Sequence, residues 1–242
     1  MDRYQLQEKI QQQPDAKLKD LVMQLLYDDI ISLKIGPGSR MNVNQLSSQL
    51  GISRTPVVEA VTGLTEMGFI VNLPDQSGSY VLGLSLKDMI SLYQVRDAVE
   101  SEAAYLCAYN AEDDIVRELT RLADAFRDSV ALRDIRGMRE TDMPFHRLII
   151  RSCGNPYLVR SYEQILPYLT RYQASMLEFI GRVSNKDNPW LANVKYNHTS
   201  VVSAIRMRMP ELAKQSMAEH IASSLNFTSL SGENIDPFSS LG

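Results

Sequence analysis

The sequence is poor in cysteine and has no long apolar run. Its two cysteines among 242 residues, Cys107 and Cys153, are too few and too far apart for a disulfide framework or a thiolate metal site, so we expect two reduced structural thiols. No stretch approaches the roughly 18 apolar residues that span a bilayer, and the polar start MDRYQLQEKIQQQP offers no signal-peptide core. We therefore expect a cytoplasmic protein with no membrane partner.

Positive charge is also scarce, with 25 lysines and arginines against 29 aspartates and glutamates and a net charge of −4. This total argues against nucleic-acid binding, because neutralising phosphates requires concentrated Lys and Arg. Residues 34–58, however, contain Lys34, Arg40 and Arg54 and no acidic residue, so this stretch is locally positive. An apolar fraction of 44% and a charged fraction of 22% are typical of a globular chain, here long enough for two domains.

The first third of the chain has the pattern of helices followed by a hairpin. Apolar residues at three- and four-residue steps predict a helix at about residues 17–33, and two further helices fit residues 44–50 and 53–67, the last ending before Gly68. Gly51 supplies a left-handed turn between the second and third, so this pair forms a helix-turn-helix. We expect the hydroxyl of Ser53 or Thr55 to cap the last helix. Residues 69–73 and 79–82 then predict a two-stranded hairpin, which after a helix-turn-helix is a wing.

Three runs within this region carry a family pattern: IGPGSR at 35–40, LSSQLGISRTPV at 46–57 and GFI at 68–70. Through them residues 17–84 resemble the GntR family of bacterial regulators, and GISRTP is the most specific part. The resemblance implies that the second helix of the helix-turn-helix enters the major groove, that Arg54 meets a base edge, and that Ser53 and Thr55 contact phosphate. The residues expected to face DNA are Arg40, Asn44, Ser53, Arg54, Thr55, Val58 and Gly78.

Val58 departs from the family pattern, which usually has an arginine at this position, one residue before Glu59. The missing second arginine implies either a different operator sequence, with Val58 against a thymine methyl, or weaker binding. A winged helix can also bind protein in place of DNA, and the residues alone leave that alternative open.

After Leu84 the strand signals vanish and helical patterns follow one another. Ser85 with Asp88 forms a capping-box-like start to a helix with a broad apolar stripe. Further helices are predicted at about residues 115–126, 141–153, 157–180, 194–207 and 211–226. Together they predict an antiparallel helical bundle, so the expected fold class is mainly α, with an N-terminal winged helix-turn-helix.

The three histidines of the chain, His146, His198 and His220, all fall in this helical region. Asp142 lies four residues before His146, so both side chains share one face of a helix. His198 and His220 lie on the next two predicted helices, a spacing that suits adjacent antiparallel helices joined near Pro210. A lone histidine on a helix face usually only bonds to a neighbour, whereas a set of four such residues favours a metal site.

Four groups of residues in this region match a second family pattern: DMPFHRLI at 142–149, SCGNPYL at 152–158, His198 with Ala204-Ile205, and Ala213 with MAEHI at 217–221. Through them residues 86–228 resemble the helical ligand-binding domain of the FCD subfamily of GntR regulators. The resemblance implies that Asp142, His146, His198 and His220 bind a divalent metal ion in the cavity of the bundle.

Three imidazoles and one carboxylate suit Zn²⁺ or Ni²⁺ and leave one or two coordination positions open. The resemblance implies that a small organic acid fills the open position through its carboxylate. Arg96 and Arg171 are the candidates to hold the other end of this acid, because each falls on a helix that otherwise reads as inward-facing.

Pro144 lies between two expected metal ligands and is awkward there, because a proline inside a helix removes a hydrogen bond and clashes one turn back. A helix that starts near Thr141 avoids this cost. A helix that starts earlier would carry a kink that moves Asp142 and weakens the site.

These parts together predict a homodimeric DNA-binding regulator, most simply a repressor, whose operator affinity is controlled by a small carboxylate metabolite. We expect it not to be an enzyme. Two alternatives remain: a metal-dependent enzyme that activates water, and a constitutive DNA-binding protein with a structural metal. The predicted domains are a polar N-terminal tail at 1–16, the winged helix-turn-helix at 17–84, a helical metal-binding, ligand-binding and dimerisation domain at 85–228, and a C-terminal tail at 229–242.

Overall fold

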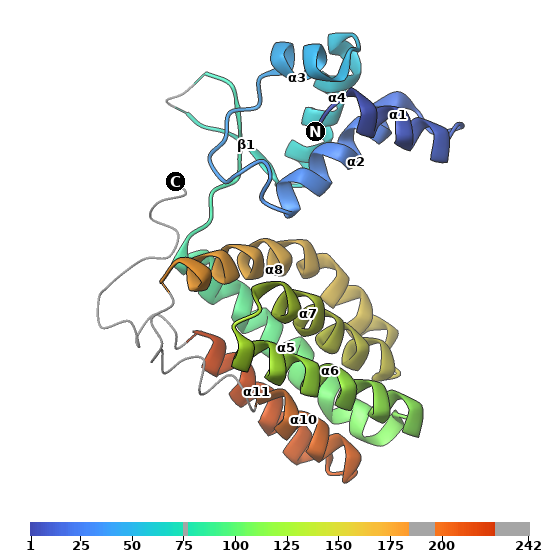
Figure 1. Cartoon of the computed structure of the whole chain (residues 1–242), viewed down its shortest axis with the longest axis vertical. Coiled ribbons are helices and arrows are strands. Elements are labelled where there is room, and N and C mark those ends of the chain that lie inside the picture. Colours follow the sequence, from blue (N-terminus) through green and yellow to red (C-terminus); the bar gives the residue numbers. More distant parts are fainter. Residues whose placement is uncertain (75–76, 184–196, 226–242) are drawn as a thin grey trace. The chain divides into compact units, whose positions relative to one another are not determined.

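The computed structural model describes residues 1–74, 77–183 and 197–225. Between Leu84 and Ser85 the chain divides into two compact units, and each is described by itself (Figure 1). Both are built mainly from helices, so the predicted fold class is confirmed. No helix in the described part of the chain is long and apolar enough to cross a membrane.

The N-terminal unit is a winged helix-turn-helix with one additional helix. Its elements are α1 (Arg3–Gln12), α2 (Leu18–Ile31), α3 (Val43–Leu50), α4 (Arg54–Glu66), β1 (Ile70–Asn72) and β2 (Ser79–Val81). Gly51 adopts a φ of 66° between α3 and α4, a left-handed conformation that glycine reaches without steric cost. Helix α4 packs on α2 and buries Val57 and Leu64 completely. This packing leaves the opposite face of α4 in solvent.

The wing is the antiparallel pair β1 and β2, with Ile70 opposite Val81. Arg40 forms a bridge to Tyr80 beside this pair, and the backbone N–H of Met41 donates to Ser79 at 2.8 Å. The segment around Arg40 therefore runs along the wing, although the sequence places it before α3.

Residues 1–16, which we expected to form a polar tail, contain α1. Asp2 and Gln5 form a capping box at its start, and Leu6 is buried with 2% exposure. Lys9 pairs with Asp28 of α2 at 3.1 Å. The helix is held by one apolar contact and by tertiary ion pairing, which apolar periodicity does not reveal.

The C-terminal unit is a helical bundle. Its described helices are α5 (Leu86–Asn110), α6 (Asp113–Leu132), α7 (Ile135–Ser152), α8 (Pro156–Val183), α10 (Asn197–Arg206) and α11 (Pro210–Leu225). Helix α11 packs along α5 and against α10, and α7 packs against both α6 and α8 (Figure 1). The predicted helix start near 194, the predicted end near 226 and the C-terminal tail lie outside the described residues.

The two cysteines lie inside this bundle as free, buried thiols. Burial raises the pKa of Cys107 to about 12, so this thiol stays protonated and unreactive at neutral pH. Both cysteines therefore serve as small apolar core residues.

Helix α7 begins at Ile135, not near Thr141 as predicted, so Pro144 lies inside it. The predicted start was too late because the first six residues of α7, Ile135–Glu140, have only two apolar side chains and therefore show no clear apolar stripe. Pro144 has no backbone N–H, so the carbonyl of Glu140 lacks its usual helical hydrogen bond. Both residues are exposed and lie four apart on the same face of α7, so this carbonyl lies on the solvent side of the helix. The predicted displacement of Asp142 by a kink does not occur, because Asp142 and His146 still face the same point inside the bundle.

Candidate metal centre

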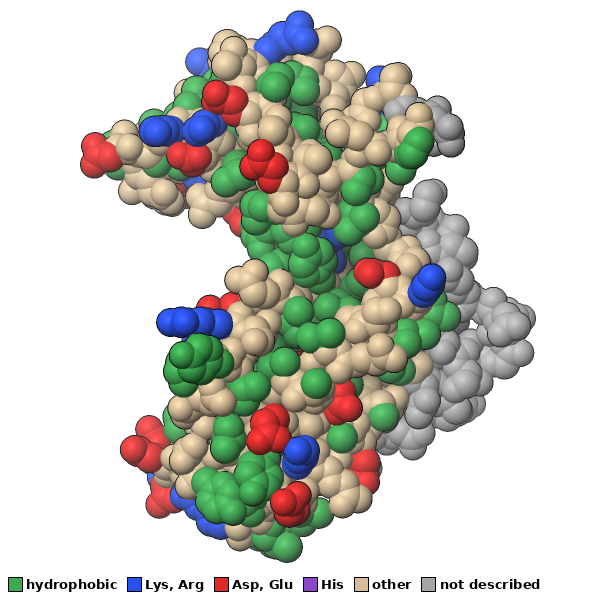
Figure 2. Space-filling model, turned by 180° about the vertical axis from the view of Figure 1, so that it is seen from behind, with side chains coloured by type: hydrophobic (Ala, Val, Ile, Leu, Met, Phe, Trp, Pro, Cys, Tyr) green, Lys and Arg blue, Asp and Glu red, His purple; other side chains and the backbone are tan. Residues whose placement is uncertain are grey.

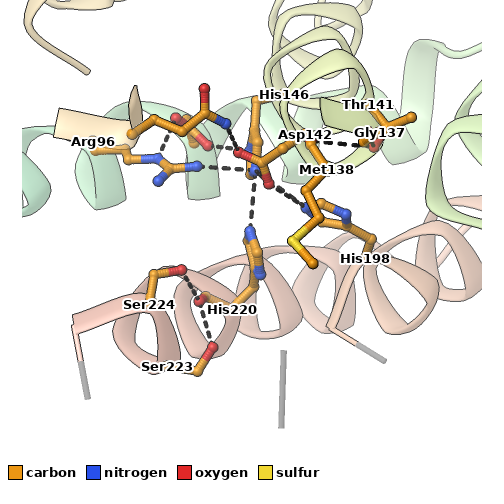
Figure 3. Close-up of polar contacts among 12 residues, drawn as sticks. Arg96, Gly137, Met138, Thr141, Asp142, His146, His198, His220, Ser223 and Ser224 are labelled. Carbon is orange, nitrogen blue, oxygen red and sulfur yellow. Dashed lines mark hydrogen bonds and ion pairs between the residues drawn. The ribbon is translucent and has the colours of Figure 1, made fainter. Parts of the chain in front are cut away.

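Asp142, His146, His198 and His220 meet inside the bundle (Figure 3). Helix α7 supplies Asp142 and His146, α10 supplies His198 and α11 supplies His220. One potential ligand atom from each residue lies within 4.8 Å of the others. The three histidines are 0–3% exposed, and the Asp142 side chain is 17% exposed. Four side chains from three helices thus converge on one buried point.

The separations between these atoms fit a shared cation. The Nε2 atom of His146 lies 3.0 Å from that of His220 and 3.3 Å from that of His198. Oδ1 of Asp142 lies 3.2 Å from His198 Nε2 and 3.7 Å from His146 Nε2. A metal ion with bonds of about 2.1 Å holds neighbouring ligand atoms roughly 3.0–3.4 Å apart. The donor set and its spacing both suit Zn²⁺ or Ni²⁺.

The protonation states also suit metal binding. Burial lowers the pKa of His198, and burial with the neighbouring cations holds that of His220 well below 6.5. Burial raises the pKa of Asp142, but the hydrogen bonds and charges of His146 and His198 outweigh it and hold this pKa well below 3.8. Burial lowers the pKa of His146, but Glu100 outweighs it and the pKa is raised. Near neutral pH the cluster therefore offers neutral His198 and His220 and an ionised Asp142, the forms that bind metals.

A second layer of polar residues supports this cluster. Oε2 of Glu100 lies 2.6 Å from His146 Nδ1, and Oε1 of the same carboxylate accepts from Arg96 Nε at 2.8 Å. Gln173 Nε2 donates to Asp142 Oδ2 at 2.5 Å. A carboxylate behind a metal-binding histidine fixes the ring so that its other nitrogen faces the metal. The sequence analysis missed Glu100 and Gln173, although Glu100 could have been found four residues after Arg96 on a helix that reads as inward-facing.

A cavity of about 60 Å³ lies beside the cluster. Arg96, Asp142, Gln173 and His220 line it, together with apolar side chains of α5, α7 and α8. Nη2 of Arg96 lies 2.9 Å from His146 Nε2, so its guanidinium reaches both the cavity and the cluster. Arg171 is buried with 1% exposure but does not line this cavity. The structure thus brings one of the two predicted ligand-binding arginines to the site and leaves the other apart.

All seven residues expected to face DNA are exposed: Arg40, Asn44, Ser53, Arg54, Thr55, Val58 and Gly78. Ser53 is the N-cap residue of α4, but its side chain makes no capping hydrogen bond, so the expected hydroxyl cap is wrong. The first turn of α4 therefore keeps backbone N–H groups without a side-chain cap, and such groups suit phosphate. Gly78 lies next to Arg40, where an added Cβ would come within 3.1 Å of the guanidinium Nε.

A winged helix-turn-helix joined to a helical bundle with a buried cluster of this kind defines the class of transcriptional regulators. Residues 18–81 match the bacterial regulatory proteins of the gntR family, and residues 91–223 match the FCD domain. The chain belongs to the FCD-containing GntR family, as its motifs predicted.

Several known proteins are similar to this chain over most of its length. The gluconate operon transcriptional repressor of Bacillus licheniformis is 24% identical over 191 residues, 79% of this chain and 76% of that protein. The probable D-xylose utilization operon transcriptional repressor of Paenarthrobacter nicotinovorans is 26% identical over 216 residues, 89% of this chain and 90% of that protein. The solved structure of E. coli McbR/YncC shares the fold, with a TM-score of 0.68 and 20% identity over 90% of this chain and 100% of that one.

The family settles the general function. The chain is a DNA-binding transcriptional regulator and not an enzyme, as predicted, because the similar proteins are regulators. GntR regulators bind operator DNA and typically act as dimers. FCD domains are known to bind metal, and among the described residues Asp142, His146, His198 and His220 form a group that could hold one.

Proposed function

We propose that this chain is a homodimeric repressor whose operator affinity is set by a small organic acid bound at a divalent metal ion. Asp142, His146, His198 and His220 would hold the metal. The observation that carries the proposal is the convergence of these four ligand atoms beside a cavity. The names of the similar repressors, for a gluconate operon and a D-xylose utilization operon, support control by a sugar or a sugar acid.

The bound metal would supply a positive charge and an open coordination position for a carboxylate. Arg96 supplies a second cation at the same cavity. Its guanidinium is held in place by Glu100, so it is positioned before an acid binds. The present cavity, about 60 Å³, has room for roughly four to six water molecules, which favours a short acid. We assign no such role to Arg171, because it does not line the cavity.

In this proposal, α8 transmits the effect of acid binding toward the DNA-binding unit. Gln173 bonds to Asp142 at the cluster. The preceding residue, Tyr172, accepts a hydrogen bond from the backbone N–H of Ser85 at 3.2 Å and donates to Asp88 Oδ2 at 2.7 Å. Ser85 is the first residue after the DNA-binding unit. A shift of α8 on binding would therefore reach the connection between the two units, which is the differential contact that ligand control requires.

On the DNA side, we assign base contact to Arg54 and phosphate contact to Ser53, Thr55 and the wing. Their exposure at the start of α4 supports this assignment. Val58 is 45% exposed and lies one turn further along α4, where it would meet an apolar base edge such as a thymine methyl.

The test measures operator binding by fluorescence anisotropy with metal-loaded protein, chelator-treated protein and a His198→Ala variant. Short hydroxy acids, and gluconate for comparison, are titrated into each sample. We expect an active acid to weaken operator binding about tenfold in the metal-loaded protein only. Asp124→Asn is the matched control, because this exposed carboxylate pairs with Arg127 away from the cluster. If chelation lowers the melting temperature but no acid changes operator affinity, the metal is structural and the proposal of ligand control fails.

A further inference from the structure

A second, larger cavity of about 540 Å³ lies between α6, α7 and α8. Three arginines of α7, Arg139, Arg147 and Arg151, contribute to its wall. Apolar side chains such as Leu122 and Leu166 form much of the remainder. A concave surface of this size, mainly apolar with a few charged groups, is typical of a small-molecule site.

Unlike their neighbours, these three arginines have no acidic partner within the part of the chain that the structure describes. Arg121 pairs with Glu118, Arg127 with Asp124, and Arg136 with Glu140, each at 2.7 Å. In contrast, no ion pair joins the three cleft arginines to any carboxylate of the described residues. The cleft also contains Glu118, but Arg121 already binds that carboxylate through two hydrogen bonds.

On the face of the helical unit that Figure 2 draws, charges of both signs are mixed. Figure 2 shows a face on which Lys and Arg side chains are scattered singly among acidic ones. In a chain with 29 acidic and 25 basic residues, three arginines that surround one cavity and pair with no described carboxylate concentrate positive charge locally. Mutual repulsion among them disfavours an empty cleft and is relieved when an anion enters.

We propose that the cleft binds a small organic dianion, a phosphate ester or a dicarboxylate, at a site separate from the metal centre. The planar guanidinium groups of Arg147 and Arg151, one helical turn apart, suit two acidic groups or one phosphate. The apolar wall suits the carbon skeleton of such a metabolite. This site does not depend on the proposed metal or on the acid that we propose for it.

The two cavities share part of their walls. Met143 and Gln173 line both of them, and Gln173 also bonds to Asp142. An anion that draws Gln173 toward the cleft changes the support of Asp142. If the proposed metal site is correct, the two sites therefore influence each other's affinity, and this influence is reciprocal.

The test uses the full chain, with inorganic phosphate and succinate as the two probes, titrated by calorimetry at constant ionic strength. The double variant Arg147→Gln/Arg151→Gln is compared with the control double variant Arg136→Gln/Arg160→Gln, which removes two exposed arginines outside the cleft. We expect at least one of the two probes to bind the wild type, and to bind the cleft variant about tenfold more weakly. Its affinity for the control variant should equal that for the wild type. Thermal melts check that both variants are folded.

A His198→Ala sample separates this site from the metal centre. Binding that persists in it supports an independent cleft site, whether or not the proposed metal site exists. Equal weakening in the cleft and control variants would mean an adventitious ion only and would overturn the proposal. Absence of binding by both probes, or its loss in His198→Ala, would overturn it as well.

Discussion

Arg96 and Glu100 form a buried ion pair one turn apart on α5, with side chains 6% and 1% exposed. Replacing Glu100 with alanine would leave the Arg96 guanidinium buried without a carboxylate and His146 without its support. We expect Glu100→Ala to lower the free energy of unfolding by about 3–5 kcal/mol, measured by urea unfolding.

The chain offers a matched control for this prediction. Arg136 and Glu140 have the same residue types and spacing on α7, but their side chains are 85% and 59% exposed. Water solvates both charges there, so Glu140→Ala should leave stability unchanged within error. Similar losses in both variants would contradict the view that burial makes the Glu100 pair important.

In the metal-free protein, the pH dependence of the free energy of unfolding should follow the protonation of His220. Its pKa in the folded protein lies well below 6.5, the value expected in the unfolded chain. Between these two values the unfolded chain binds a proton that the native state does not, so the free energy of unfolding falls as the pH drops below about 6.5. His198 acts in the same direction. The raised pKa of His146 acts oppositely, with stability present at low pH and lost as the pH rises above 6.5.

Urea unfolding of chelator-treated protein from about pH 8 to about pH 5 measures this effect. A His220→Asn variant lacks the main titrating group, so its stability should fall less steeply below pH 6.5. If the free energy of unfolding depends on pH in the same way in the variant and the wild type, groups other than His220 cause the loss of stability at low pH.

At the scale of elements, two adjacent residues of α8 contact the candidate metal centre and the start of α5. Tyr172 holds the start of α5 at Ser85 and Asp88, and Gln173 holds Asp142. We expect Tyr172→Phe to keep metal binding and the fold but to reduce the effect of the acid on operator affinity, because the link to Ser85 is lost. Comparing operator anisotropy with and without the acid gives this coupling directly.

A surface change on the same helix controls for general effects on α8. Arg160→Ala alters an exposed side chain near the start of α8 that lies over the ring of Tyr157, away from both ends of the proposed link. It should leave the coupling unchanged. Full coupling in Tyr172→Phe would show that the acid acts through another element.

At the scale of the whole molecule, the homodimer that we propose would present each proposed DNA-facing residue twice to a two-fold operator. Arg54→Ala should therefore weaken operator binding by about 1–3 kcal/mol for each half-site and reduce discrimination against altered operators. Fluorescence anisotropy with wild-type and base-substituted operators measures both effects. Arg136→Ala, in the helical unit, is the control, and an equal loss in that variant would argue against base contact by Arg54.

The sequence by itself determined the two domains, the family and the four residues of the candidate metal centre. These features rest on local patterns: GISRTP at the helix-turn-helix, and Asp142 with His146 four residues apart on one helix face. Helix periodicity also predicted the bundle, because an apolar stripe must be buried against other helices.

Only the tertiary structure decided which residues support the site. Glu100 is far in sequence from His146, and Gln173 from Asp142, so no local pattern predicts these two contacts. Packing likewise separated Arg96, which lines the cavity, from Arg171, which does not. It also made α1 a helix and kept Pro144 on the solvent side of α7. Such outcomes depend on which helix faces meet, and that is fixed by the packing of the whole bundle.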